Sequence, residues 1–301
     1  MPARDAATAG PADGPQLAGL LLLAVAVVGW GSFWPPIKLL IDELPMATAR
    51  ALPGLAGGLL LALVVWLSGE RLAVPRSLWP RLCLAALLNI TAWMGLSTFA
   101  LLWLNASETC LVCYTMPLWA ALLAWPVLGE KPGPRRLIGL GLGMAGLLLI
   151  VGGRGVELGL AKLPGVGFGL GAALLFALGT VLTKRRPLPL PAGTALAWQL
   201  ILGMLPLGLA ALWFDRPDPA TFSTQAWLLI AYGAVGPMSL CYLAWFAALR
   251  RLPAGVIATG TLAGPAIGVL GSALVLGEPF GLPEAAALGL TLGGVALAAR
   301  G

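Results

Sequence analysis

The sequence contains no histidine, only four cysteines and few charged residues, which make up 10% of its 301 positions. Soluble domains carry about 25% charged residues, so this composition excludes an ordinary water-soluble domain. Without histidine, no imidazole can relay protons or bind a metal ion. Cys110 and Cys113 form a C-x-x-C pair, but no second pair accompanies them. We therefore expect neither a metal nor any other cofactor.

Hydrophobic residues account for 59% of the chain. They recur in runs of roughly 20 residues, the length that crosses the hydrocarbon core of a bilayer. Because backbone polar groups must be satisfied internally in lipid, we expect these spans to be helices. The predicted fold is therefore an all-α, multi-pass integral membrane protein, preceded by a disordered tail over residues 1–16. Ten spans are expected, near 17–41, 46–68, 80–103, 106–127, 136–153, 164–184, 192–214, 225–249, 254–276 and 283–300.

Lysine and arginine are distributed unevenly between the two sides of this arrangement. With a cytoplasmic N-terminus, thirteen of the 18 lie on the cytoplasmic side. This bias favours ten spans with both termini inside, most simply in a bacterial inner (plasma) membrane. A basic chain could also bind nucleic acid, but no basic cluster exceeds three residues, so the expected partners are lipid and a small molecule. Nothing requires an oligomer, and a monomer is a plausible state. The five basic residues on the other side are Lys38, Arg50, Arg154, Lys162 and Arg216.

The chain matches itself without a gap when it is shifted by 148 residues. Each copy holds five expected spans, and because five is odd, the second copy enters the membrane inverted. Inverted repeats are typical of secondary transporters. The expected organisation is a first repeat over 17–153, a linker over 154–163 and a second repeat over 164–301. Matched positions include Gly31-Ser32 with Gly179-Thr180, Pro117 with Pro265, and Leu128-Gly129-Glu130 with Leu276-Gly277-Glu278.

These motifs resemble a known family. Trp30-Gly31-Ser32, together with the Pro…Leu-Gly-Glu…Gly…Gly pattern in both copies, is similar to the drug/metabolite transporter superfamily in its ten-helix EamA-type branch. The resemblance covers nearly the whole chain and implies an exporter or facilitator of small metabolites. Amino-acid exporters, including aromatic ones, are prominent in that family, and this makes amino acids the leading substrates. The alternatives are a multidrug or other metabolite exporter and a non-transporting membrane protein, such as an embedded enzyme or an assembly factor. Catalysis is not expected, because no nucleophile–base pair is visible within the spans.

Ionisable residues are rare within the expected spans. Lys38, Arg50 and Glu108 fall near span ends. We therefore expect an interior free of charge, which favours a small neutral or zwitterionic substrate over a strongly anionic or cationic one. Asn105 and Glu108 fit a capping box at the start of the fourth span. Glu278 and its counterpart in the first repeat are expected to have structural roles at opposite membrane faces.

Polar and aromatic side chains deep in the spans are the candidate substrate-binding residues. Ligand pockets combine apolar and aromatic walls with a few polar groups. The alternative is that hydroxyl groups bond back to their own helix and that tryptophans anchor the protein at the membrane interface. The candidates are Trp30, Ser32, Trp34, Asn89, Trp93, Ser97, Tyr114, Thr180, Thr183, Tyr242, Trp245 and Thr261.

Four prolines are candidate hinges. Pro35 and Pro36 interrupt the first span, while Pro117 and Pro265 occupy equivalent places in the fourth and ninth. A proline removes a backbone hydrogen bond and crowds the carbonyl four residues earlier. The first-span break should free backbone carbonyls near a cavity or bend its mouth. The alternative is that each proline sets a fixed packing kink.

Overall fold

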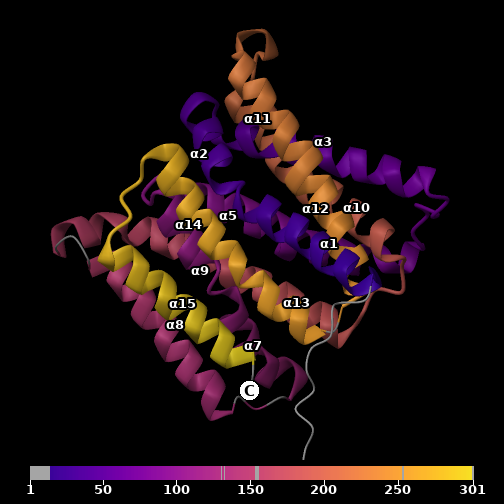
Figure 1. Ribbon diagram of the computed structural model, residues 1–301. Coiled ribbons are helices and arrows are strands. Elements are labelled where there is room, and N and C mark those ends of the chain that lie inside the picture. The colour runs from indigo at the N-terminus through magenta and orange to yellow at the C-terminus, as the bar shows by residue number, and fades with distance from the viewer. Residues whose placement is uncertain (1–13, 130, 132, 153–155, 253, 300–301) are drawn as a thin grey trace, which may run out of the picture.

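Every regular element that the structure describes is a helix (Figure 1). The computed structural model describes residues 14–129, 131, 133–152, 156–252 and 254–299. Seven helical stretches in this part of the chain are long and apolar enough to cross a membrane. Three shorter apolar helices accompany them, at Leu137–Gly146, Ala263–Leu276 and Leu282–Leu297. The prediction of an all-helical chain is confirmed for the described residues.

Several stretches consist of two or three helical pieces in series. The α-helices of the first half are α1 (Gly14–Gly31), α2 (Trp34–Glu43), α3 (Met46–Leu67), α4 (Trp79–Ala86), α5 (Trp93–Ala100), α6 (Ala106–Cys113), α7 (Met116–Leu128) and α8 (Pro134–Gly152). In the second half they are α9 (Val156–Arg185), α10 (Ala192–Ala210), α11 (Thr224–Val235), α12 (Cys241–Leu249), α13 (Ala254–Thr261), α14 (Ala263–Leu276) and α15 (Leu282–Ala299). Short π-helical turns at Leu87–Ala92 and Gly236–Leu240 join α4 to α5 and α11 to α12.

The 148-residue shift reappears in the spacing of these elements. α6 and α13 begin 148 residues apart, and so do α5 and α12 and also α8 and α15. The segment expected as a linker is helical from Val156 onward, where α9 begins. Of the expected N-terminal tail, residues 14–16 belong to α1, and residues 1–13 lie outside the described part of the chain.

The two halves pack on each other. α3 lies along α10 and α11, α1 along α12 and α14, and α8 along α15. Figure 1 shows the indigo α1 beside the orange α12, and the magenta α8 beside the yellow α15. A Cβ on Gly294 would lie 2.5 Å from the carbonyl oxygen of Gly139, so α15 approaches α8 closely at this glycine. Interior packing therefore depends on contacts between segments that are far apart in sequence.

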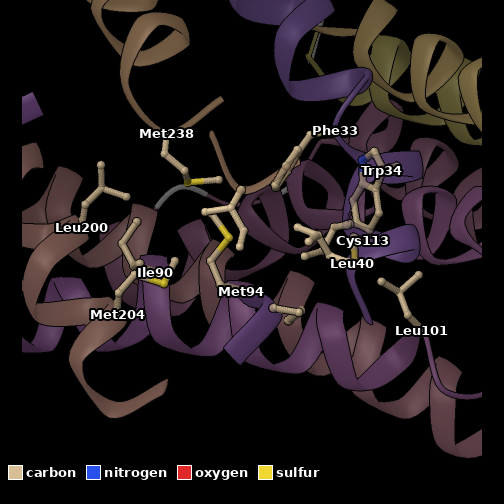
Figure 2. Close-up of a cluster of buried hydrophobic side chains, with 14 of the residues drawn as sticks. Phe33, Trp34, Leu40, Ile90, Met94, Leu101, Cys113, Leu200, Met204 and Met238 are labelled. Atoms are coloured by element: carbon tan, nitrogen blue, oxygen red, sulfur yellow. The ribbon is translucent and has the colours of Figure 1, made fainter. Parts of the chain in front are cut away.

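The largest core cluster occupies the centre of this arrangement. It includes Phe33, Met94, Leu200 and Met238, all less than 9% exposed (Figure 2). These side chains come from the α1–α2 connection, α5, α10 and the π-turn before α12. The cavity described below lies beside this cluster and shares some of its side chains.

Helix ends follow the sequence expectations. The capping box of Asn105 and Glu108 at the start of α6 is confirmed. Gly129 and Gly277 end α7 and α14 with φ of 78° and 66°, a backbone region that glycine adopts without steric cost. Glu278 accepts hydrogen bonds from the amides of the first two residues of α6, which confirms its structural role. Its counterpart, residue 130, lies outside the described residues.

Candidate functional site

A cavity of about 500 Å³ lies at the centre of the helical bundle. Small-molecule sites fall within about 300–1,000 Å³ and are mostly apolar with a few polar groups. The wall combines side chains from both halves of the chain: Val27, Trp30, Phe33, Trp34, Ile37, Arg50, Trp93, Met94, Tyr114, Met116, Phe176, Thr180, Met238, Tyr242, Trp245, Thr261 and Gly264. Eight of the twelve candidates lie in this wall.

Irregular backbone is concentrated around the cavity. The α1–α2 break at Ser32 and Phe33, the α6–α7 break at Tyr114 and Thr115, and the α13–α14 break at Leu262 each border lining residues. The two π-turns end immediately before Trp93 and Cys241, next to the lining residues of α5 and α12. Interrupted helices at membrane depth are tolerated where they line a cavity or are covered by protein, and they are frequent in secondary transporters.

The candidate hinge prolines lie at the starts of new helices. Pro35 and Pro36 are the second and third residues of α2, Pro117 is the second residue of α7, and Pro265 is the third residue of α14. Proline is tolerated there, because the first turn lacks intrahelical partners for its amides. The break after Gly31 is also tightly packed, since a Cβ on that glycine would lie 2.8 Å from a carbonyl oxygen of α14.

Aromatic rings build two walls of the cavity. The ring centroid of Trp30 lies 4.9 Å from that of Tyr242 and 5.6 Å from that of Trp245. The indole of Trp30 donates a hydrogen bond of 3.0 Å to the carbonyl oxygen of Pro237, which holds the ring in place. On another wall, the ring centroids of Trp93 and Phe176 lie 4.9 Å apart. Contacts of this kind stabilise ring orientation beyond simple burial, so the walls are preformed.

Four candidates lie outside the cavity wall. The hydroxyl of Ser32 pairs with that of Tyr232 at 2.7 Å. The amide of Asn89 donates to the side chain of Gln199 at 3.2 Å, between helices. Thr183 bonds back to its own helix and lines a smaller hollow of about 330 Å³. Ser97 is fully buried beside Arg50.

The cavity is closed at one end and exposed at the other. Ile37 in the first half of α2 and Arg50 in the first two turns of α3 are 1% and 5% exposed. Thr180, close to the C-terminal end of α9, is exposed. The exposed end of the cavity therefore lies near Thr180, and its buried end lies near Arg50.

The geometry agrees with comparisons to known proteins. The profile of the EamA-like transporter family matches residues 17–152 and 163–300. The chain belongs to this family. The transporter YvbV of Bacillus subtilis, named as uncharacterized, is 30% identical over 284 residues, which cover 94% of this chain and 92% of YvbV.

A further relative of this EamA-like chain is more distant, and a solved structure resembles it in fold. The aromatic amino acid exporter YddG of Ancylobacter novellus is 26% identical over 201 residues, which cover 64% of this chain and 66% of the exporter. A crystal structure of another protein superposes with a TM-score of 0.66 at 20% identity, covering 95% of this chain and 98% of that one. The structural likeness shows a shared fold.

The expectation of a charge-free interior is wrong. Arg50 is buried and lines the cavity, although its position near a span end suggested a loop charge. Four and seven residues later on the same helix face, Gly54 and Gly57 pack against Met204 and Met238. This small-residue face is the sequence signal that places Arg50 inside the bundle, because residues at these spacings point the same way.

Proposed function

We propose that this EamA-like protein is a secondary transporter of small neutral or zwitterionic metabolites, with amino acids, including aromatic ones, as leading substrates. The observation that carries the proposal is the central cavity, which is closed at one end and bounded by interrupted helices from both halves. Such a site, lying between two structural repeats, suits alternating access.

The proposed topology has ten spans with both termini in the cytoplasm of a bacterial cell, as inverted five-helix repeats. The seven helices that are long and apolar enough to cross a membrane, together with the three shorter apolar helices, support a count of ten spans. The asymmetry of basic residues supports the orientation, and it becomes stronger once Arg50 is removed from the outer count because it lies in the cavity. In this orientation the exposed end of the cavity faces the cytoplasm.

The aromatic walls support a substrate with an apolar or aromatic body. Trp30, Tyr242 and Trp245 form one continuous cluster that offers ring faces and edges. The identity to an aromatic amino acid exporter points in the same direction. Conversion between inward-open and outward-open states is assigned to bending at Pro35, Pro36, Pro117 and Pro265, where the helices are already interrupted.

Counterflow into proteoliposomes tests the proposal. Liposomes containing the purified chain are loaded with unlabelled amino acids, and uptake of each labelled amino acid is followed. Trp245→Ala should slow uptake, because it removes one ring of the wall. Asn89→Ala is the matched control, since that amide bonds to Gln199 outside the wall. Absence of counterflow for all amino acids, with folded protein in the vesicles, would refute the proposal.

A further inference from the structure

Arg50 lines the closed end of the cavity with part of its guanidinium group unpaired. Its Nε donates to the carbonyl oxygen of Met94 at 3.4 Å, and its Nη2 donates to the hydroxyl of Ser97 at 3.3 Å. Its Nη1 is buried and has no hydrogen-bond partner. The Cζ atom lies 5.7 Å from the ring centroid of Phe33, which also lines the cavity.

No carboxylate in the described part of the chain forms an ion pair with Arg50. Acidic residues at the same end of the bundle are already bonded elsewhere, and Asp42 pairs with Lys38. Glu43 accepts from the start of α11, Asp215 from the first turn of α3, and Glu278 from the first turn of α6, while Glu108 pairs with a lysine. Arg50 is therefore a buried cation without a counter-ion.

A buried arginine in this state fits a ligand better than it fits a purely structural role. Buried charges are normally paired, and guanidinium groups bind carboxylates with two parallel N–H···O bonds. The bonds to Met94 and Ser97 tie α3 to α5 and hold the guanidinium in place, yet they use only two of its five hydrogens. Nη1 keeps both of its hydrogens for a further acceptor.

We propose that Arg50 binds the carboxylate of the transported substrate, with the substrate's apolar body lying between the aromatic walls. This inference rests on the proposed transport function and narrows its substrate class. Among the residues that the structure describes, the cavity wall includes no Asp or Glu to pair with an amino group. The carboxylate is therefore the group that the site requires, and the amino group is dispensable for binding.

Three ligands with the same aromatic body test this requirement by calorimetric titration of the purified full-length chain. L-phenylalanine carries both charged groups, 3-phenylpropionate only the carboxylate, and phenethylamine only the ammonium group. We expect phenylalanine and 3-phenylpropionate to bind at least about tenfold more tightly than phenethylamine. L-leucine, 4-methylpentanoate and isoamylamine repeat the test with an aliphatic body.

Two variants separate ligand binding from a structural tie. Arg50→Gln should weaken binding of phenylalanine at least about tenfold and leave phenethylamine unchanged or tighter, because the repulsive charge is gone. Ser97→Ala removes one tie to the guanidinium but keeps its charge, so the preference for carboxylates should persist. The comparison of the three ligands on the unmodified chain stands even if Arg50→Gln does not fold.

Equal affinity of the unmodified chain for phenylalanine and phenethylamine would overturn the assignment, as would absence of binding by all six compounds. A loss of the same factor for both charge types in Arg50→Gln would make Arg50 purely structural. Counterflow of phenylalanine without a preference for carboxylates would refute the anion site and leave transport intact. Binding of carboxylates without counterflow would refute transport and leave the anion site.

Discussion

The two halves of the chain are held together by different contacts at the two ends of the bundle. At the end that holds the connection from α2 to α3 and the start of α11, carboxylates of one half bind helix starts of the other. Glu278 accepts from the amides of Ala106 and Ser107 at 2.7 and 2.9 Å and from the Ser107 hydroxyl at 2.6 Å. Asp215 accepts from the amide and the hydroxyl of Thr48, both at 2.8 Å.

Two more acidic residues make similar contacts at this end. Glu43 accepts from the amide and the hydroxyl of Ser223 at 3.0 and 2.9 Å, and Glu108 forms an ion pair with Lys162. Every one of these contacts joins the first half of the chain to the second. Carboxylates at helix N-termini are favourable because they meet unpaired amides and the positive end of the helix dipole.

The opposite end is held by hydrogen bonds to backbone carbonyl oxygens, among them those from Thr194 to Arg71 and from Trp198 to Leu72. Arg81 donates to the carbonyl oxygens of Arg186 and Pro187, but it does so at an exposed position. Beside it, a hollow of about 330 Å³ separates α4 from the end of α9. The difference explains why the cavity is buried at Arg50 and exposed at Thr180: inter-half carboxylate bonds seal one end, and the other end lacks equivalent bonds among the described residues.

Glu278→Ala should have the largest effect on this asymmetry. It removes three hydrogen bonds and leaves the amides at the start of α6 without their acceptors, next to a Ser107 side chain that is 2% exposed. We expect a loss of about 1–3 kcal/mol, seen as a lower melting temperature of the purified protein.

The control for this variant lies at the other end. Arg81→Ala removes exposed bonds and should change stability by no more than about 0.5 kcal/mol. If both variants lower the melting temperature equally, the contacts at the two ends contribute equally to stability. That result would contradict the proposed difference between the ends.

Cysteine labelling tests the second consequence, access to the cavity from one end only. In a background where the exposed Cys83 is replaced by serine, Thr180→Cys should react with a polar maleimide about tenfold faster than Ile37→Cys. The reason is that position 180 is exposed and position 37 is 1% exposed. Comparable rates at both positions would show that the end near Arg50 is open.

Proline replacement tests whether the sealed end opens by bending. Pro117→Ala and Pro265→Ala should permit hydrogen bonds to form across the breaks before α7 and α14, and so favour one shape. We expect substrate binding to persist while counterflow slows several-fold relative to the unmodified chain. Normal turnover with normal stability would exclude hinges at these prolines, and lost stability alone would indicate fixed packing kinks.

The smallest expected effect is that of an imposed gradient on amino-acid transport. Arg50 keeps its proton at physiological pH, and a zwitterion carries no net charge across the membrane. Neither a pH gradient nor a potential should therefore drive concentrative uptake of phenylalanine.

3-Phenylpropionate is the matched control for the gradient experiment. Each such anion moves one charge, worth about 2.3 kcal/mol per 100 mV. The potential should therefore shift its distribution across the membrane. Concentrative uptake of phenylalanine under either gradient would contradict the prediction.

Local features of this protein follow from its sequence. The apolar runs predict helices because only internally bonded backbone is stable in lipid. The capping box of Asn105 and Glu108 is a short-range pattern, and the structure confirms it. The glycines that end α7 and α14 are short-range features as well. Eight of twelve proposed site residues line the cavity, and these eight include all six aromatic candidates.

Tertiary structure decided which polar groups meet. Thr183 bonds to its own helix, while Asn89 meets Gln199 in α10. Periodicity gives the face of a helix but does not say which distant helix covers that face. Two polar candidates can therefore have different surroundings, although both were expected to face the substrate.

Arg50 is the clearest case of a role that sequence position concealed. It lies four residues from the start of α3, where a charge would ordinarily reach water. Packing of α3 against α10 and α11, together with bonds to α5, buries it instead. The sequence by itself determined the helices and the apolar interior. Only the association of the two halves put a positive charge at the closed end of the cavity, because burial depends on the neighbours that cover a residue.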